Sequence, residues 1–259
     1  MTEVSRLYIF LCGFEILRKT VSTRDRGARF IMSEPVCVYL VQTANQLLLF
    51  DTGINSDNIN DPARRARYYP EDTFVRPPVV LPEHELLPQL QAVGVAPGDI
   101  TQVILSHSHC DHTGNLKDFR HAKVSIQRLE YEHAFGDNED KAVFRSDFDF
   151  PDMNWHIVGG DWEVLPGVRG LLTRGHKPGH QSLVVDLPNS GTKILAADAG
   201  DLAENFEQEV LPGESVDDAA ALASIRKIKR VAAETGGEIV LFHDPNFIQQ
   251  ARLAPAFYD

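Results

Sequence analysis

The densest group of histidine and aspartate side chains in the sequence is the segment SHSHCDH at residues 106–112. It follows an apolar run that is typical of a β-strand, and in an extended segment His107 and His109 point to the same side. A turn after them brings Asp111 and His112 round to the same place. Three imidazoles and one carboxylate within six residues are ligands that borderline-soft divalent metals prefer. The segment therefore predicts a metal site, against the alternative of a polar loop with hydrogen-bonded histidines.

These neighbouring positions cannot complete the ligand shells of two metal ions, so further ligands are expected at the ends of other strands. The candidates are His176 or His180 in the segment GHKPGH, Asp198 in ADAG, and His243 in LFHD. Each follows a β-rich run, and ligand sites in open sheets collect at strand ends. Any one of these residues alone could equally be a structural turn residue, but together they favour a shared site.

Two strand-rich parts of the chain, with amphipathic helices between and after them, predict an αββα sandwich of the α+β class. We expect one domain over residues 1–259, with two sheets face to face and helices outside. The segments 54–80 and 143–161 are expected to be irregular, and the first is long enough for a lid, a binding segment or a dimer contact. Ser215 is expected to cap the last long helix. Strands are predicted at 6–17, 36–50 with a turn at 43–46, 100–105, 124–126, 162–173, 181–187, 192–197 and 238–242, and helices at 83–93, 128–142 and 216–233.

Several motifs resemble the metallo-β-lactamase superfamily, whose signature His-x-His-x-Asp-His stands at a strand end. More closely, the chain looks like the N-acyl-homoserine lactonase branch of that superfamily, and the resemblance covers nearly its whole length. It implies the metallo-β-lactamase-like four-layer sandwich. The motifs are LFDTG at 49–53, SHSHCDHTGN at 106–115, IQRLEYEHA at 126–134, GDWEVLPGV at 160–168, GHKPGHQSL at 175–183 and ENFEQEV at 204–210.

The resemblance also implies which residues bind the metals. The first histidine of the Gly-His-x-x-Gly-His element, His176, is the ligand, and His180 is left to support the site or to face the substrate. Two divalent ions are expected, most simply Zn²⁺, and the ligands also accept Mn, Co or Fe. The implied ligands are His107, His109 and His176 for one ion, Asp111, His112 and His243 for the other, and Asp198 as the bridge.

A dinuclear centre of this kind predicts hydrolysis of a carboxylic ester. A water between two dications ionises near neutral pH, and the resulting metal-bound hydroxide attacks the carbonyl carbon. Asp111 and Asp198 are the expected catalytic carboxylates, since the resemblance implies that Asp111 carries a proton to the leaving alkoxide. The expected substrate is a lactone, either N-acyl-homoserine lactone-like, which would make the enzyme quorum-quenching, or a catabolic lactone.

The sequence departs from the lactonase pattern at two positions near the expected site. Family lactonases carry a tyrosine three residues after the bridging aspartate, where its hydroxyl donates a hydrogen bond to the lactone carbonyl, and here Asp201 stands there. Cys110 stands where a phenylalanine is common. We expect Asp201, His180, Phe148 and Tyr69 to contact the substrate, in a pocket for which the aromatic candidates are Tyr68, Tyr69, Phe74, Phe144, Phe148 and Trp155.

Composition limits the partners and the compartment. The chain has 25 Lys and Arg against 37 Asp and Glu, and a net charge of −12 makes nucleic acid or an anionic membrane an improbable partner. Three scattered cysteines do not form a disulfide framework, and the first residues lack the pattern of a signal peptide. We therefore expect a cytoplasmic enzyme, a monomer or homodimer, acting on a small-molecule lactone.

Two other function classes compete with the lactonase. The first is another hydrolase of the same fold: a thioesterase resembling glyoxalase II, a β-lactamase or a phosphodiesterase. The second is a metal-free binding module or a redox protein with two iron ions. A binding module is disfavoured because all seven ligand positions are filled.

Overall fold

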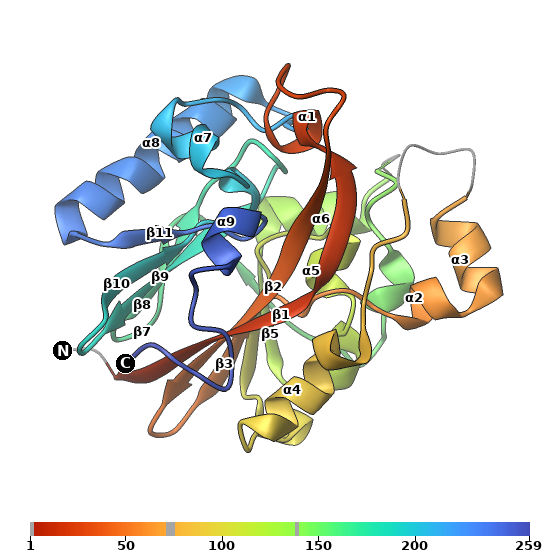
Figure 1. The fold of residues 1–259 in the computed structure, drawn as a ribbon. Helices are drawn as coiled ribbons and strands as arrows, with labels where there is room; N and C mark the ends of the chain where they lie inside the picture. Colours follow the sequence, from red (N-terminus) through yellow and green to blue (C-terminus); the bar gives the residue numbers. More distant parts are fainter. Residues whose placement is uncertain (1–2, 71–75, 138–139) are drawn as a thin grey trace.

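The computed structural model describes residues 3–70, 76–137 and 140–259, and in these residues two β-sheets lie face to face (Figure 1). The first sheet has the strand order β1-β2-β3-β4-β5-β6, and the second has the order β11-β10-β9-β8-β7. The strands are β1 (Val4–Arg18), β2 (Ile31–Thr43), β3 (Leu47–Phe50), β4 (Gln102–Ile104), β5 (Lys123–Gln127), β6 (Asn154–Val158), β7 (Trp162–Leu165), β8 (Val168–Leu172), β9 (Gln181–Leu187), β10 (Gly191–Leu195) and β11 (Glu238–Val240).

The pairing of the first sheet changes from antiparallel to parallel along its width. Strands β1, β2 and β3 are antiparallel neighbours, and the predicted turn at 43–46 joins β2 to β3. In that turn the Thr43 hydroxyl accepts hydrogen bonds from the backbone N–H groups of Asn45 and Gln46. From β3 to β6 the neighbours are parallel, so their carboxyl ends meet at one edge of the sheet.

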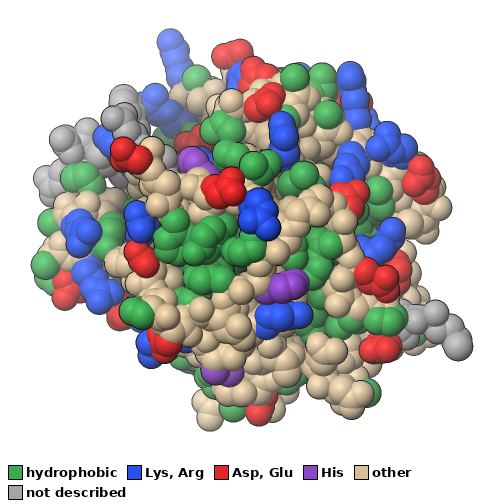
Figure 2. All heavy atoms as spheres, turned by 180° about the vertical axis from the view of Figure 1, so that it is seen from behind, with side chains coloured by type: hydrophobic (Ala, Val, Ile, Leu, Met, Phe, Trp, Pro, Cys, Tyr) green, Lys and Arg blue, Asp and Glu red, His purple; other side chains and the backbone are tan. Residues whose placement is uncertain are grey.

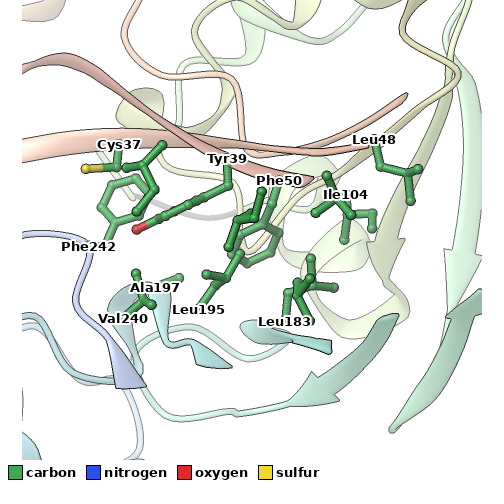
Figure 3. Packing of buried hydrophobic residues seen from close by; sticks show 14 of the residues in the cluster. Cys37, Tyr39, Leu48, Phe50, Ile104, Leu183, Leu195, Ala197, Val240 and Phe242 are labelled. Carbon is green, nitrogen blue, oxygen red and sulfur yellow. The ribbon is translucent and has the colours of Figure 1, made fainter. Parts of the chain in front are cut away.

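The core between the sheets is made by alternate residues of their strands. Along β2, Tyr39 belongs to this inner cluster, whereas Val38 and Leu40 belong to a second cluster on the outer face. Figure 3 shows Tyr39 of the first sheet extending toward Phe242, and Phe50 lying near Leu195 of the second sheet. Consecutive residues of β2 are thus buried on opposite faces, which fits a strand that is covered on both sides.

Helices supply the outer layers. Helix α4 (Leu86–Ala92) and helix α6 (Arg128–Phe135) pack on the outside of the first sheet, and helix α8 (Asp218–Thr235) packs on β10 and β11 of the second. On α8, the buried Ile225 and Ile228 lie one turn apart and join the cluster that contains Ile194. The αββα prediction is confirmed. The shorter helices are α1 (Lys19–Ser22), α2 (Asp57–Asn60), α3 (Pro62–Tyr68), α5 (Cys110–Thr113), α7 (Ala203–Glu207) and α9 (Pro245–Ile248).

The prediction that residues 54–80 are irregular is wrong for the first part of that segment, which forms α2 and α3. The Asp61 carboxylate accepts hydrogen bonds from the backbone N–H groups of Ala63 and Arg64, and Pro62 begins α3. Aspartate followed by proline is a helix-start signal. The polar composition of residues 54–80 makes the Asp61-Pro62 signal hard to distinguish from a loop.

Other boundaries also differ from the predictions. Helix α6 ends at Phe135, followed by Gly136, and does not continue to 142. Residues 162–173 form the hairpin β7–β8, and the segment 143–161 contains β6. Helix α8 is capped by Asp217, whose carboxylate accepts a hydrogen bond from Ala220 N–H, whereas the Ser215 hydroxyl donates to the carbonyl of Pro212.

A helix that spans a membrane must be long and apolar, and a basic patch consists of lysine and arginine side chains gathered on one face. Among the described residues, no helix combines the length and the apolar character needed to cross a bilayer. On the face seen in Figure 2, lysine, arginine, aspartate and glutamate are interspersed around apolar areas and do not gather into a basic surface.

Candidate metal centre

The segment after β4 presents its side chains as the sequence predicts. His109 has an extended backbone (φ −66°, ψ 155°), and the single turn of α5 follows it. This turn brings Asp111 and His112 back beside His107 and His109. All four side chains are buried.

The remaining candidates come from loops of the second sheet. His176 lies in the connection between β8 and β9, Asp198 follows β10, and His243 follows β11. Because β10 and β11 are parallel, Asp198 and His243 lie at the same edge of the sheet. These three residues thus meet the segment 107–112 of the first sheet.

The first group of ligand atoms contains three imidazoles. His176 Nε2 lies 3.2 Å from His107 Nε2 and 3.3 Å from His109 Nδ1. Asp198 Oδ2 lies 3.6 Å from His107 Nε2 and 3.5 Å from His176 Nε2. Four buried atoms therefore surround one point.

The second group lies on the other side of the same aspartate. His112 Nε2 is 3.0 Å from Asp111 Oδ2, and His243 Nε2 is 3.6 Å from that oxygen. Asp198 Oδ1 lies 3.3 Å from His112 Nε2 and 3.5 Å from His243 Nε2. Each carboxylate oxygen of Asp198 thus faces one group, which is the arrangement of a bridging ligand.

The donor atoms fit divalent cations. Within the described part of the chain, His112 Nε2 and Asp198 Oδ1 are buried and form no hydrogen bond, which is costly unless another group satisfies them. Nitrogen and carboxylate oxygen atoms that converge from several sides are suited to Zn²⁺ and similar ions. The atoms within each of two groups lie close enough together to share an ion. The first group is His107, His109, His176 and Asp198, and the second is Asp111, His112 and His243.

Contacts behind the imidazoles orient them. The carbonyl of Pro35 accepts a hydrogen bond from His243 Nδ1 at 3.0 Å, which leaves the lone pair of Nε2 facing the site. Asp51 Oδ2 lies 2.9 Å from His112 Nδ1, and Asp51 Oδ1 accepts a hydrogen bond from Ser106 N–H at 2.7 Å. Asp51 has φ 63°, an unusual conformation for a residue with a side chain. That Asp51 orients His112 was not predicted from the sequence, although Asp51 lies in the LFDTG motif.

Glu130 of α6 is a second supporting residue that sequence reasoning missed. Its fully buried carboxylate accepts hydrogen bonds from Ser108 N–H (2.9 Å), the Ser108 hydroxyl (2.6 Å) and Gly179 N–H (3.1 Å). It therefore connects the ligand segment of the first sheet to the loop that carries His176. Its place in the IQRLEYEHA motif was the available signal.

Two glycines bring these loops into backbone contact. A Cβ atom on Gly114 would lie 2.2 Å from the backbone nitrogen of Asn55, and one on Gly179 would lie 2.2 Å from that of Glu130. Both separations are far below van der Waals contact. Each position therefore requires glycine for packing.

The protonation of the histidines differs between the two groups. Burial lowers the pKa of His107 and of His176 well below the ordinary value, so both stay neutral and able to bind a metal. Burial also acts to lower the pKa of His112 and His243. The nearby carboxylates, Asp111 for His112 and Asp198 for both, outweigh it and hold the two pKa values above the ordinary one.

His180 supports the bridging residue. It is fully buried, its Nε2 accepts a hydrogen bond from Asp198 N–H at 3.0 Å, and its Nδ1 lies 2.9 Å from the Thr173 hydroxyl. His180 therefore contacts the backbone of Asp198 and does not line the cavity.

A cavity of about 1250 Å³ opens above the ligands, and aromatic residues form one of its walls. Tyr69 packs edge-on against Phe144 with ring centroids 5.6 Å apart, and Tyr68 stacks on Phe144 at 4.3 Å. Phe148 and Trp155 instead pack in the outer core of the first sheet and do not line the cavity. This placement removes Phe148 from the expected substrate contacts. Phe74 lies outside the described residues.

The cavity also has an acidic wall, formed by Glu15, Glu34 and Asp201. Glu34 is 1% exposed and Asp201 is 7% exposed. Burial raises the pKa of each carboxyl group above its ordinary value. Asp201 thus lines the cavity as expected, while the two glutamates were not expected.

Comparison with known proteins agrees with this geometry. The model of the metallo-beta-lactamase superfamily matches residues 34–243. N-acyl homoserine lactonase AiiA of Bacillus thuringiensis subsp. kurstaki is 34% identical over 254 residues, 98% of this chain and 99% of the relative. N-acyl homoserine lactonase AttM of Azorhizobium caulinodans is 33% identical over 190 residues, 70% and 72% of the two chains.

Solved structures show the same similarity. An N-acyl homoserine lactone hydrolase with the product N-hexanoyl-L-homoserine at its catalytic metal center has a TM-score of 0.89 and 32% identity, over 100% of both chains. The dizinc quorum-quenching lactonase AidC shares the fold, with a TM-score of 0.67 and 18% identity. The chain therefore belongs to the metallo-β-lactamase superfamily, in the branch of the N-acyl homoserine lactonases.

Proposed function

We propose that this protein is a dinuclear metal-dependent hydrolase that opens the ring of a lactone. The observation that carries the proposal is the position of Asp198, with one oxygen toward each group of ligands, at the base of a cavity of small-molecule size. The relatives support the reaction class, because they are named N-acyl homoserine lactonases and a solved structure of one holds its product at the metal center.

The proposed ligands are the seven side chains of the two groups, and Zn²⁺ is the proposed ion in both. Two such ions would lower the pKa of a water between them and polarise an ester carbonyl. We infer from the three scattered cysteines that the enzyme is cytoplasmic, and we propose that it is a monomer or a homodimer. Quorum quenching is its proposed role if the lactone is an N-acyl homoserine lactone.

We propose that Asp111 transfers a proton of the reaction and that Tyr69 donates a hydrogen bond to the substrate. Asp111 lines the cavity, and its carboxylate would take a proton from the attacking water and give it to the alkoxide that leaves when the ring opens. Tyr69 lines the same cavity and is 6% exposed. Burial raises the pKa of its phenol, so the hydroxyl keeps its proton and is a donor for a substrate oxygen.

A substrate panel tests this proposal. The zinc-loaded protein is incubated with γ- and δ-lactones, linear esters, thioesters, β-lactams and a phosphodiester, and proton release is followed by pH-stat. We expect release with lactones and little with the other classes. Asp198→Asn is the inactive control. If thioesters, β-lactams or the phosphodiester react and lactones do not, the enzyme is one of the other hydrolases of this fold.

A further inference from the structure

The acidic wall of the cavity brings two glutamates together across a strand pair. Glu15 of β1 and Glu34 of β2 are direct register partners in the antiparallel pair. Directly opposed residues in such a pair have their Cβ atoms about 5 Å apart, and like charges there are destabilising. Asp201, which follows the bridging residue by three positions, lines the cavity with them.

Neither the buried Glu34 and Asp201 nor the half-buried Glu15 has a lysine or arginine partner among the described residues. One oxygen of Glu34 accepts a hydrogen bond from the Ser22 hydroxyl at 2.6 Å. The other oxygen of Glu34, and Asp201 Oδ1, are buried and accept none. An unsatisfied buried carboxylate is costly, so these oxygens indicate a ligand that donates to them.

The position of this wall limits what the ligand is. Asp201 and the metal ligands Asp198 and His243 have side-chain atoms within 4.8 Å of one another, so a group bound at Asp201 lies beside the reacting carbonyl. Neutral aromatic residues form another wall, and they suit an apolar part of a substrate. A compact, positively charged donor matches the two unpaired oxygens of Glu34 and Asp201 and the further carboxylate of Glu15.

We propose that the lactone opened by this enzyme carries an ammonium group near the ring, and that Glu34 and Asp201 accept its hydrogen bonds while Glu15 adds charge. This inference rests on the proposed lactonase function and names its substrate class. It also gives a role to Asp201, which stands where family lactonases have a tyrosine. The tyrosine hydroxyl donates a hydrogen bond to the lactone carbonyl, whereas the Asp201 carboxylate accepts one from the substrate nitrogen.

Four γ-butyrolactones that differ only in the α-substituent test the proposal with the zinc-loaded enzyme: amino, trimethylammonio, tert-butyl and acetamido. The trimethylammonio and tert-butyl groups have the same shape and differ in charge, and acetamido offers a neutral N–H. The assay pH lies below the pKa of the amine, and each kcat/KM is divided by the hydroxide-catalysed rate of the same lactone. We expect the amino lactone to exceed the tert-butyl lactone by about 10- to 100-fold, with the trimethylammonio lactone between them.

Two variants locate the effect. Glu34→Gln and Asp201→Asn should each lower the ratio of amino to tert-butyl kcat/KM by about tenfold. Glu207→Gln removes one exposed charge elsewhere and should leave the ratio unchanged. Metal content and circular dichroism of each variant are measured, and since the two acids lie on different elements, a folding defect in one variant leaves the other as the test.

The outcomes separate this inference from the proposed function. Hydrolysis of the tert-butyl or acetamido lactone at an equal or higher normalised rate would overturn the ammonium proposal and leave the lactonase intact. A third metal ion per chain that disappears in Glu34→Gln would show that the wall binds a metal instead. If none of the four lactones, nor any lactone of the panel above, is opened, the proposed function itself fails.

Discussion

At the scale of single residues, Asp198 is the side chain on which both halves of the centre depend. One of its oxygens faces the three-histidine group and the other faces the group of Asp111, His112 and His243. A substitution at Asp198 therefore affects two ions, whereas a substitution at His243 affects one. The difference is measurable as metal stoichiometry.

We expect Asp198→Ala to lose both ions on dialysis and His243→Ala to keep about one, with hydrolysis abolished in both. Inductively coupled plasma mass spectrometry of dialysed protein gives the stoichiometry. His121→Ala, which removes an exposed histidine, is the control and should retain both ions. Two ions retained in Asp198→Ala would contradict the bridging role.

The two groups also differ in the protons they hold before metal binds. In the metal-free protein at pH 7, the raised pKa values of His112 and His243 keep these imidazoles protonated, while His107 and His176 are neutral. A metal binds only the neutral imidazole, so loading must release protons. The affinity for the ion held by Asp111, His112 and His243 should therefore fall as the pH is lowered, because more protons must be displaced.

Zinc titrations of the metal-free protein at pH 7, in buffers of different ionisation enthalpy, should show net release of protons from His112 and His243, in addition to the proton lost by the metal-bound water. Isothermal titration calorimetry measures the number of protons. The variant His121→Gln should release as many as the unsubstituted chain. A binding enthalpy that is independent of the buffer would show that these histidines are neutral beforehand.

Sequence reasoning works best at this scale when ligands are neighbours in the chain. The spacing of His107, His109, Asp111 and His112 fixes their relation within one strand end and one turn. The acidic wall could not be predicted in this way, because Glu15 and Glu34 become neighbours only through the register of β1 and β2. The aromatic residues have the same difficulty: Tyr69 and Phe148 look alike in the sequence, yet one lines the cavity and the other fills the core.

At the scale of elements, Glu130 of α6 holds together two ligand loops from different sheets. Its carboxylate receives three hydrogen bonds, two from Ser108 and one from Gly179. Nothing in the helical pattern of α6 distinguishes this buried acid from its exposed neighbours, because its partners are far away in the sequence. This kind of support escapes prediction from local patterns.

Glu130→Ala should lower the free energy of unfolding by about 3 kcal/mol, since three buried donors lose their acceptor. Glu130→Gln keeps an oxygen for Ser108 and should cost only about 1 kcal/mol. We expect metal affinity to fall about 10- to 100-fold in Glu130→Ala, as for other residues that support ligands. Urea unfolding and competition with a chelator measure the two quantities.

The control for these changes lies on the same helix. Glu132→Gln alters an exposed carboxylate and should change neither stability nor metal affinity. Equal effects of the substitutions at 130 and 132 would mean that the buried hydrogen bonds contribute nothing measurable.

At the scale of the whole molecule, the centre joins the two sheets. Four of its ligands follow β4 of the first sheet, and His176, Asp198 and His243 follow strands of the second. The sequence predicted the sandwich and this meeting of strand ends, because the strand-rich halves and the motifs are visible in it. It did not predict α2 and α3, whose start signal at Asp61 and Pro62 lies in a polar segment.

Because both sheets contribute ligands, bound metal stabilises the folded chain against unfolding. At free metal about a thousand times the dissociation constant, the gain is about 4 kcal/mol. For a chain of this size we expect a chelator to lower the unfolding temperature by about 10 °C. Differential scanning fluorimetry with and without dipicolinate measures the shift, and Asp198→Ala should show almost none. An equal shift in that variant would place the stabilising metal elsewhere.

The backbone contacts at Gly114 and Gly179 have a consequence for how such a chain diversifies. They fix two points of the ligand loops through main-chain packing, so neither position accepts a larger side chain. The cavity walls come from other elements, and Glu15, Glu34 and Tyr69 lie outside those contacts. Substitutions among the cavity-lining residues can therefore change the preferred substrate during evolution, while the two glycine contacts keep the metal-ligand loops in the same position.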